Sequence, residues 1–273
     1  MGITTSDKYC SKKMQLSGFN LILIILLGFL VMFILYPLLS LVYNVANTKF
    51  VESLLKQDLI KSLLLSLTTA TISTSILCIF GIPLAYVLAR FRFRLKFMIR
   101  ILIIVPLVLP PLISGTILLN AYGPYSFIGK RVTVDLTQSP LGIIIAQTYV
   151  ASPFIILSSQ AAFESVPERY EIIARVLGKK RWEVFFRITL PLAKTGIVVG
   201  MLMTWVRSLG ELGATMMMAY NPHTISIQIF EDNAIGGLQN SVPGIMWVIL
   251  ISIVFLMIFF FVKRHHTLII FGK

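Results

Sequence analysis

Long apolar stretches separated by short polar segments make up most of this chain. A helix that crosses a membrane needs about 20 apolar residues. Six stretches have roughly this length or more, and they cover residues 19–43, 59–89, 101–121, 141–162, 195–219 and 244–262. None of them alternates strictly between apolar and polar residues, as the strands of a membrane β-barrel do. The pattern therefore predicts an all-α integral membrane protein with six transmembrane helices.

The composition points to the same class of protein. The chain has 273 residues, of which 57% are hydrophobic and 13% are charged, whereas soluble domains contain about 25% charged residues. A soluble domain of this composition would expose more apolar surface than water tolerates. A disordered chain would contain few large apolar side chains. Nucleic-acid-binding proteins carry their basic residues on a polar surface, so we expect a multi-pass protein of the cell membrane with no nucleic-acid partner.

The positive charge lies mostly on one side of the predicted membrane domain. The formal net charge is +13. Segments 1–18, 90–100, 163–194 and 263–273 together hold 18 lysines and arginines, whereas the segments on the opposite side hold five. Basic residues favour the cytoplasmic side of a membrane. We therefore expect both termini to be cytoplasmic. Tail 1–18 precedes the membrane domain, which covers residues 19–262, and tail 263–273 follows it.

Two of the apolar stretches have an unusual composition. Stretch 59–89 is rich in serine and threonine, which allow close contacts and hydrogen bonds between membrane helices. The same hydroxyls also suit the lining of a polar pathway, so both interpretations stay open. Stretch 101–121 contains Pro106, Pro110 and Pro111. Because proline lacks a backbone donor and kinks a helix, we expect a break there that neighbouring helices or a cavity must compensate.

The sequence contains no visible catalytic machinery of its own. Cys10 lies in a polar tail and Cys78 in an apolar stretch, so we expect two free thiols. His265 and His266 adjoin basic residues, and a metal site needs more ligands than this pair. No Ser/His/Asp or Cys/His group is apparent. We therefore expect no enzymatic activity, no catalytic residue, no metal and no cofactor in this chain.

The loop at residues 163–194, called the basic loop below, is the longest segment on the basic side, and it is strongly amphipathic. Pro167 suits the start of a helix, and Glu168 and Glu171 then lie in a first turn where the helix dipole favours negative charge. Gly178 is typical of a helix end, and a second short apolar face follows, with Pro191 at its end. Such a segment either lies on anionic lipid or docks into a groove of a partner protein.

The spacing within this loop carries a family resemblance. Residues 170–191 read YEIIARVLGKKRWEVFFRITLP. This segment resembles the cytoplasmic signature of ABC importer permeases, which is E-A-A, three residues, G, nine residues and I-x-L-P. The matching positions hold Ala174, Gly178, Ile188, Leu190 and Pro191. Ile172 stands where the family has its glutamate, and the nearest carboxylate belongs to Glu171.

The resemblance implies a type I ABC importer permease fold and a docking role for the basic loop. In that family the loop forms coupling helices that seat in a groove of a cytosolic ATPase. The implied ATPase-coupling residues are Glu171, Ala174, Arg175, Gly178, Ile188, Leu190 and Pro191. It also implies a permease homodimer, an external substrate-binding protein, and a partner subunit that binds ATP and Mg and hydrolyses the ATP.

A second resemblance concerns the substrate. Residues 207–214 read RSLGELGA, and residues 107–111 read LVLPP. Both segments resemble permeases for molybdate, tungstate and sulfate, and the continuation at 218–230 resembles the archaeal tungstate/molybdate type most. The resemblance implies a prokaryotic importer for tetrahedral oxyanions, with molybdate or tungstate as the expected substrate and sulfate or thiosulfate as the alternative.

Arg207 and Glu211 form a candidate site within the fifth apolar stretch. They are four residues apart, a spacing that places both on one face of a helix, and charges inside a membrane are rare and usually face the protein interior or a water-filled cavity. Arg207 either contacts the passing dianion or forms a structural ion pair with Glu211. Our hypothesis is that the pair organises the translocation interface. The alternatives from other classes are an ATP-independent secondary anion transporter and a membrane assembly factor.

Overall fold

The computed structural model describes residues 18–45, 54–132 and 135–271, and in these segments the secondary structure is entirely helical. The chain divides into two compact units, residues 1–50 and residues 51–273. The first unit contains a single described helix, α1 (Gly18–Val45), which includes the predicted stretch 19–43. Exposed apolar side chains follow one another along it without interruption from Leu21 to Leu27 and from Phe29 to Tyr36. A helix that is apolar on every side is typical of a membrane span.

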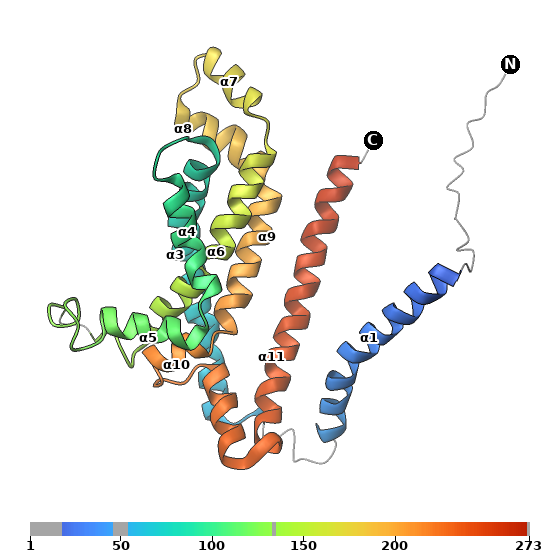
Figure 1. The fold of residues 1–273 in the computed structure, drawn as a ribbon. Helices are drawn as coiled ribbons and strands as arrows, with labels where there is room; N and C mark the ends of the chain where they lie inside the picture. The colour runs from blue at the N-terminus through green and yellow to red at the C-terminus, as the bar shows by residue number, and fades with distance from the viewer. Residues whose placement is uncertain (1–17, 46–53, 133–134, 272–273) are drawn as a thin grey trace. The chain divides into compact units, whose positions relative to one another are not determined.

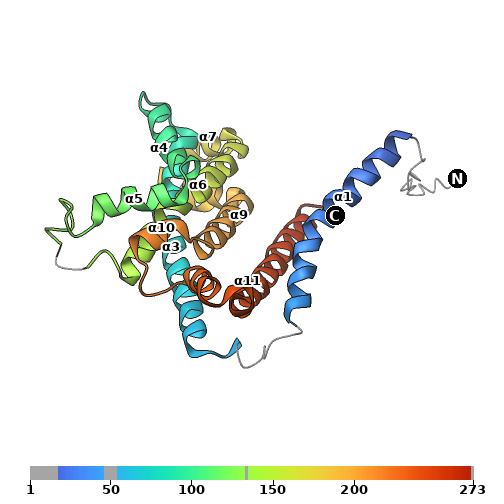
Figure 2. The ribbon, with the colours of Figure 1, turned by 60° about the horizontal axis from the view of Figure 1, so that its bottom comes forward.

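The core of the second unit is built from three long helices, α3 (Gln57–Arg90), α6 (Pro140–Ser165) and α9 (Leu190–Leu209), which run side by side in Figures 1 and 2. Their shared core contains buried apolar residues from all three helices, among them Leu77, Leu88, Ile155, Phe163 and Ile197. The helices α3 and α6 confirm the stretches predicted at 59–89 and 141–162.

Small residues bring α6 and α9 unusually close together. Gly196 and Gly200 lie one turn apart on α9, and a Cβ atom added to them would lie 2.5 Å from the Cβ of Ala162 and 2.7 Å from the Cβ of Ser158. Such distances are shorter than real Cβ contacts. The GxxxG spacing therefore allows the two backbones to approach, as it does in other membrane helix pairs.

The hydroxyls of α3 serve mainly to join helices. The buried Ser66 accepts a hydrogen bond from the backbone N–H of Ile225 over 2.7 Å, and the buried Ser73 donates one to Gln147 over 3.1 Å. The exposed Thr71 donates to a carbonyl of its own helix and accepts from the indole N–H of Trp205. These contacts favour helix packing for the serine- and threonine-rich stretch.

The predicted third helix is in fact two helices. α4 (Lys96–Val108) and α5 (Pro111–Tyr122) meet at an angle of 116°, and α5 turns away from the bundle in Figure 1. Leu109 and Pro110 between them have extended backbone conformations. The cause is local, because a residue that precedes proline is disfavoured in the helical region, and both Leu109 and Pro110 precede one.

The fifth stretch also differs from the prediction of a helix over 195–219. α9 ends at Leu209, and the short helix α10 (Gly213–Met218) follows after a break and packs against α5 and α6. At its other end, α9 continues without interruption from α8 (Arg181–Val184) through the π-helical turn η1 (Phe185–Thr189). Pro191 therefore does not end the second helix of the basic loop. It lies inside this continuous helix, directly after the π-helical turn η1, and π-type bulges and prolines are common places of irregularity in helices.

The last helix is longer than predicted. α11 (Ile225–Phe271) contains a kink at Gly237, whose φ is +68°, and includes most of the segment 220–243 that we expected to be an external loop. It also continues through most of the predicted tail 263–273. The described residues contain five helices long and apolar enough to cross a membrane, and six if α4 and α5 count as one bent span. The predicted fold class is confirmed.

Candidate functional site

The basic loop forms two short helices at one end of the second unit (Figure 1). α7 (Glu168–Val176) is followed by a tight turn, after which α8 begins. Gly178 has a φ of +85°, and the N–H of Lys179 donates to the carbonyl of Ala174 over 3.1 Å. This is the left-handed helix end that glycine favours because it has no Cβ. The predicted first short helix and the break at Gly178 are confirmed, whereas the second helix continues through η1 into α9 instead of ending at Pro191.

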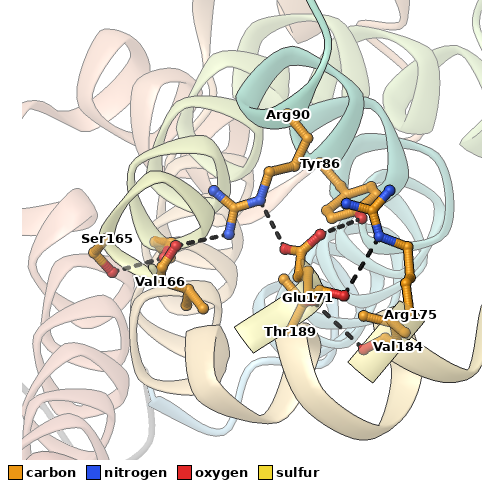
Figure 3. Close-up of polar contacts among 9 residues, drawn as sticks. Tyr86, Arg90, Ser165, Val166, Glu171, Arg175, Val184 and Thr189 are labelled. Carbon is orange, nitrogen blue, oxygen red and sulfur yellow. Dashed lines mark hydrogen bonds and ion pairs between the residues drawn. The ribbon is translucent and has the colours of Figure 1, made fainter. Parts of the chain in front are cut away.

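A buried ion pair holds α7 against the end of α3 (Figure 3). The Glu171 carboxylate accepts a hydrogen bond from Nε of Arg90 over 2.7 Å and another from the Tyr86 hydroxyl over 3.0 Å. A terminal guanidinium nitrogen of Arg90 donates to the carbonyl of Val166, just after α6, over 2.8 Å. The side chains of Arg90 and Glu171 are 8% and 9% exposed. We call Tyr86, Arg90 and Glu171 the clamp, because together they join α3, the end of α6 and α7.

Aromatic rings extend the clamp into the helix core. The ring of Tyr86 packs edge-on against Phe163 of α6 and against Phe185 of η1, with centroid distances of 5.4 Å and 4.8 Å. Such edge-to-face pairs stabilise beyond their buried area. Tyr86 of α3 thus contacts α7 through Glu171, η1 through Phe185 and α6 through Phe163.

The outer surface of the basic loop combines apolar and basic side chains. Its large exposed apolar residues are Tyr170, Ile172, Ile173, Val176, Leu177, Trp182, Phe186 and Leu192, and the most exposed are Val176 at 82% and Leu177 at 76%. All seven basic residues are also exposed, namely Arg169, Arg175, Lys179, Lys180, Arg181, Arg187 and Lys194. Among the carboxylates, Glu171 is buried in the clamp and Glu183 accepts a hydrogen bond from the Lys180 N–H. Glu164 and Glu168 are exposed as well. The loop therefore presents exposed apolar side chains, with Val176 and Leu177 as its apolar tip, together with an excess of positive charge.

The structure separates the predicted coupling residues into two groups. Glu171 and Ala174 are buried, at 7% and 5% exposure, and face the rest of the chain. Arg175 and Gly178 lie on the exposed side of the loop. The remaining three, Ile188, Leu190 and Pro191, lie in η1 and at the start of α9, and Leu190 packs against the central core. The surface available to a partner is thus formed chiefly by neighbours of the predicted residues.

Sequence analysis did not identify Tyr86 and Arg90 as site residues. Arg90 was counted only among the charges of segment 90–100. One signal was available, because Glu171 lies three residues before Ala174 and therefore on the same helix face, and a carboxylate that becomes buried needs a basic partner. The sequence could not select Arg90 over its basic neighbours.

Beside the clamp is a cavity of about 120 Å³. It is lined by Tyr86, Arg90, Phe91, Glu168, Glu171, Arg175, Arg181 and Val184. The cavity lies between the end of α3 and the two short helices, so it leaves room for small changes in the position of α7.

Arg207 and Glu211 are paired, as predicted, but they do not belong to one helix. Arg207 is in the last turn of α9, and Glu211 lies beyond its end. Glu211 is 1% exposed, and it accepts a hydrogen bond from the N–H of Ala214 over 2.8 Å, which caps the start of α10. Arg207 also borders an apolar groove of about 590 Å³ between α6, α9 and α11. The geometry favours a structural role in which the pair fixes the break between α9 and α10.

Among the described residues, no group of three or more His, Cys, Asp and Glu side chains could hold a metal ion. Cys78 is a free thiol. Cys10 and tail residues 1–17 lie outside the described residues, as do the side chains of His265 and His266.

Comparison with known proteins assigns the fold to a family. Residues 81–267 match the family of the binding-protein-dependent transport system inner membrane component. The chain belongs to this family. The permease is 39% identical over 220 residues to a probable molybdenum ABC transporter permease protein of Haloferax volcanii, with 81% of each chain covered. It is 34% identical over 226 residues to the molybdate/tungstate transport system permease protein WtpB of Methanocaldococcus jannaschii, with 82% of this chain and 90% of the relative covered. The resemblance to the molybdate and tungstate group is confirmed.

Solved structures with low sequence identity share the permease's fold. A chain of a bacterial alginate ABC transporter, solved with an alginate-bound periplasmic protein, superposes with a TM-score of 0.72 at 17% identity, covering 90% of the permease and 92% of that chain. A chain of the MetNI methionine ABC transporter superposes with a TM-score of 0.57 at 15% identity, covering 77% and 94%. The type I importer permease fold is confirmed, and the permease is a membrane-embedded transport subunit.

Proposed function

We propose that the permease forms the transmembrane pathway of an ATP-driven importer for molybdate or tungstate. The support is the group of relatives with these substrates in their names, which align with about four fifths of the chain. A family of binding-protein-dependent transporters also argues against an autonomous secondary transporter. Sulfate or thiosulfate remains the alternative substrate, because all of these ions are tetrahedral oxyanions.

The basic loop is the proposed docking site for a cytosolic ATPase subunit. The observation that carries this proposal is the exposed apolar tip, with Val176 and Leu177 more than three quarters exposed. A short amphipathic helix that enters a groove on a partner explains why such residues point away from the bundle. The clamp then transmits the motion of the ATPase to α3 and α6.

The charge of the loop specifies the chemistry of the proposed groove. Seven exposed basic residues surround the tip, and the carboxylate of Glu171 is neutralised by Arg90. Complementary charge steers partners and suppresses incorrect ones. We therefore expect carboxylates around the apolar groove of the ATPase, opposite to Arg175 and Arg181.

The remaining features of the assembly follow from this docking site. The end of the permease that carries the basic loop, and with it both termini, is cytoplasmic. The opposite end receives an external substrate-binding protein, and two permeases form a homodimer with the pathway along their interface. ATP and Mg bind the ATPase partner, and this chain supplies no catalytic group.

The docking site is tested by co-purification of the full-length permease with its ATPase. Val176→Asp places a charge on the apolar tip and is expected to reduce the retained ATPase at least tenfold, because a buried unpaired charge is costly. Val132→Asp is the matched control, since Val132 is also exposed and lies outside the basic loop. Full retention of the ATPase by Val176→Asp would contradict the proposal.

The substrate is tested by uptake in proteoliposomes that contain the complete transporter and its binding protein. Uptake of labelled molybdate is expected to require ATP. An excess of unlabelled tungstate is expected to suppress it, whereas the same concentration of sulfate is not. Uptake without ATP would support the secondary transporter instead. Equal suppression by sulfate would support the sulfate group.

A further inference from the structure

The connection between α3 and α4 consists of only five residues, Phe91 to Leu95, and alternates apolar and basic side chains. Phe91 has an extended backbone, with φ of −102° and ψ of +144°. Arg94 and Leu95 then form a turn, closed by a hydrogen bond from the N–H of Lys96 to the carbonyl of Phe93, and Leu95 already has a helical backbone conformation. We call residues 91–95 the α3–α4 turn.

The length of the turn limits where it can lie. It joins two apolar helices, one a complete candidate span and the other part of the bent pair. Five residues reach at most about 18 Å when fully extended, so the turn must stay close to the membrane boundary. The basic loop is at the same end, because Arg90 pairs with Glu171 and Arg100 pairs with Glu164. Figure 1 shows α7 extending beyond this turn.

Large apolar side chains at the turn are exposed in the second unit. Phe93 is 37% exposed, Leu95 is 60% exposed, and Phe97 in the first turn of α4 is 72% exposed. Water is an unfavourable neighbour for such a cluster. Aromatic and aliphatic side chains beside arginines are typical of segments that lie in the headgroup region of a membrane.

Two cations of the turn have no partner in the described part of the chain. Two of the carboxylates at this end are paired, Glu171 with Arg90 and Glu164 with Arg100, and Lys96 donates to the carbonyl of Phe91. A third carboxylate, Glu168, lines the cavity beside Phe91 but forms no ion pair with Arg92 or Arg94. Arg92 and Arg94 are exposed, and no ion pair or hydrogen bond joins their side chains to a described residue. Guanidinium groups bind phosphate oxygens in a bidentate manner.

We propose that the α3–α4 turn is a binding site for anionic phospholipid, in which Arg92 and Arg94 bind the headgroup phosphate and Phe93 and Leu95 insert among the acyl chains. The proposal does not depend on the substrate or on the ATPase. The competing partner is the ATPase itself, but the turn is too short to reach beyond the basic loop that is proposed to dock there.

The test measures lipid retained by the purified full-length permease. The protein is equilibrated in detergent with equal amounts of phosphatidylglycerol and phosphatidylcholine, and bound lipids are counted by native mass spectrometry. The permease is expected to retain phosphatidylglycerol selectively, and less of it at high salt because salt screens exposed charges. Arg92→Gln combined with Arg94→Gln is expected to weaken retention roughly thirtyfold, at roughly fivefold for each arginine near the membrane surface.

Two control variants isolate the position and the charge. Lys56→Gln combined with Lys61→Gln removes two exposed cations near the start of α3, the other end of that helix, and is expected to leave retention unchanged. Arg92→Lys combined with Arg94→Lys keeps the charge and is expected to keep most of the lipid. If the double glutamine variant does not elute as a monodisperse protein, the single variant Arg94→Gln is measured instead. It is expected to retain phosphatidylglycerol about fivefold more weakly.

Two results would overturn the proposal. One is equal retention of phosphatidylglycerol by the parent and the Arg92/Arg94 glutamine variant. The other is that the Arg92/Arg94 glutamine variant loses the ATPase on co-purification but still retains the lipid, which would identify the turn as a protein contact.

Discussion

Removing the Glu171 carboxylate is expected to release α7 from the bundle without unfolding the membrane domain. In Glu171→Ala the guanidinium of Arg90 loses its ion pair at a site where both side chains are less than one tenth exposed. Removing one partner of a buried pair costs about 3–5 kcal/mol. At about 1.4 kcal/mol for each factor of ten, the population with α7 detached rises by roughly two to more than three orders of magnitude. Glu171→Gln keeps the shape of the side chain and loses its charge, so we expect it to weaken the attachment of α7 by about 1.5–3 kcal/mol.

Amide hydrogen exchange of the purified permease measures this release. Amides of residues 168–176 are expected to exchange at least a hundredfold faster in Glu171→Ala, while those of α6 and α9 change little. In proteoliposomes with the ATPase and binding protein, ATP hydrolysis should continue while oxyanion uptake falls, because the docked helix no longer moves α3. Arg90→Met is expected to show the same pattern.

The control is the Arg100–Glu164 ion pair, which joins α4 to α6 at the same end of the bundle but is 40% and 47% exposed. An exposed pair contributes about 0–1 kcal/mol, so Arg100→Gln should alter neither exchange nor uptake. Unchanged exchange and normal uptake in Glu171→Ala would refute the assignment of the clamp as the mechanical link.

Three further substitutions test other parts of the structure. Gly178→Val forces a branched side chain into a left-handed turn, so it is expected to destabilise the turn by about 1–2 kcal/mol and to weaken retention of the ATPase. Gly28→Val is the control and should leave retention intact, because nothing lies within 4 Å of the added Cβ. Equal retention of the ATPase by both variants would show that the turn at Gly178 is not needed for docking. Gly200→Leu collides with Ser158 and is expected to lower the melting temperature of the purified permease by several degrees, and an unchanged melting curve would show that α6 and α9 do not pack so closely. Arg207→Gln leaves the buried Glu211 unpaired and is expected to reduce ATP-dependent uptake at least tenfold at normal surface expression. Wild-type uptake would exclude a role of this pair in translocation.

The two solved structures compared above share the fold at 17% and 15% identity, and in this chain the clamp attaches α7 firmly to the bundle. Here the attachment consists of a buried ion pair, a hydroxyl contact and two aromatic contacts. Under the proposed function, the exposed tip stays available to the ATPase.

Local chemistry made several features predictable from the sequence alone. The membrane class follows from the length of the apolar stretches, because a bilayer demands about 20 such residues for each helix. The two short helices of the basic loop follow from the acidic first turn and from Gly178, whose lack of a Cβ permits the left-handed turn. The proline-rich stretch 101–121 indicated a break in the helix. The sequence predicted neither the position of this break nor the angle of 116° between α4 and α5.

Only the tertiary structure decided which residues make up the site. Glu171 and Arg90 are 81 residues apart, and burial of a charge depends on the partner that the fold brings to it rather than on its neighbours in sequence. The fifth stretch was predicted as one helix because its apolar length was sufficient for a single span. The break in it depends on Glu211, which caps the start of α10, and the sequence alone does not show this contact. The sequence determined which segments cross the membrane, and the packing of those segments determined which side chains are clamped inside and which remain available to a partner.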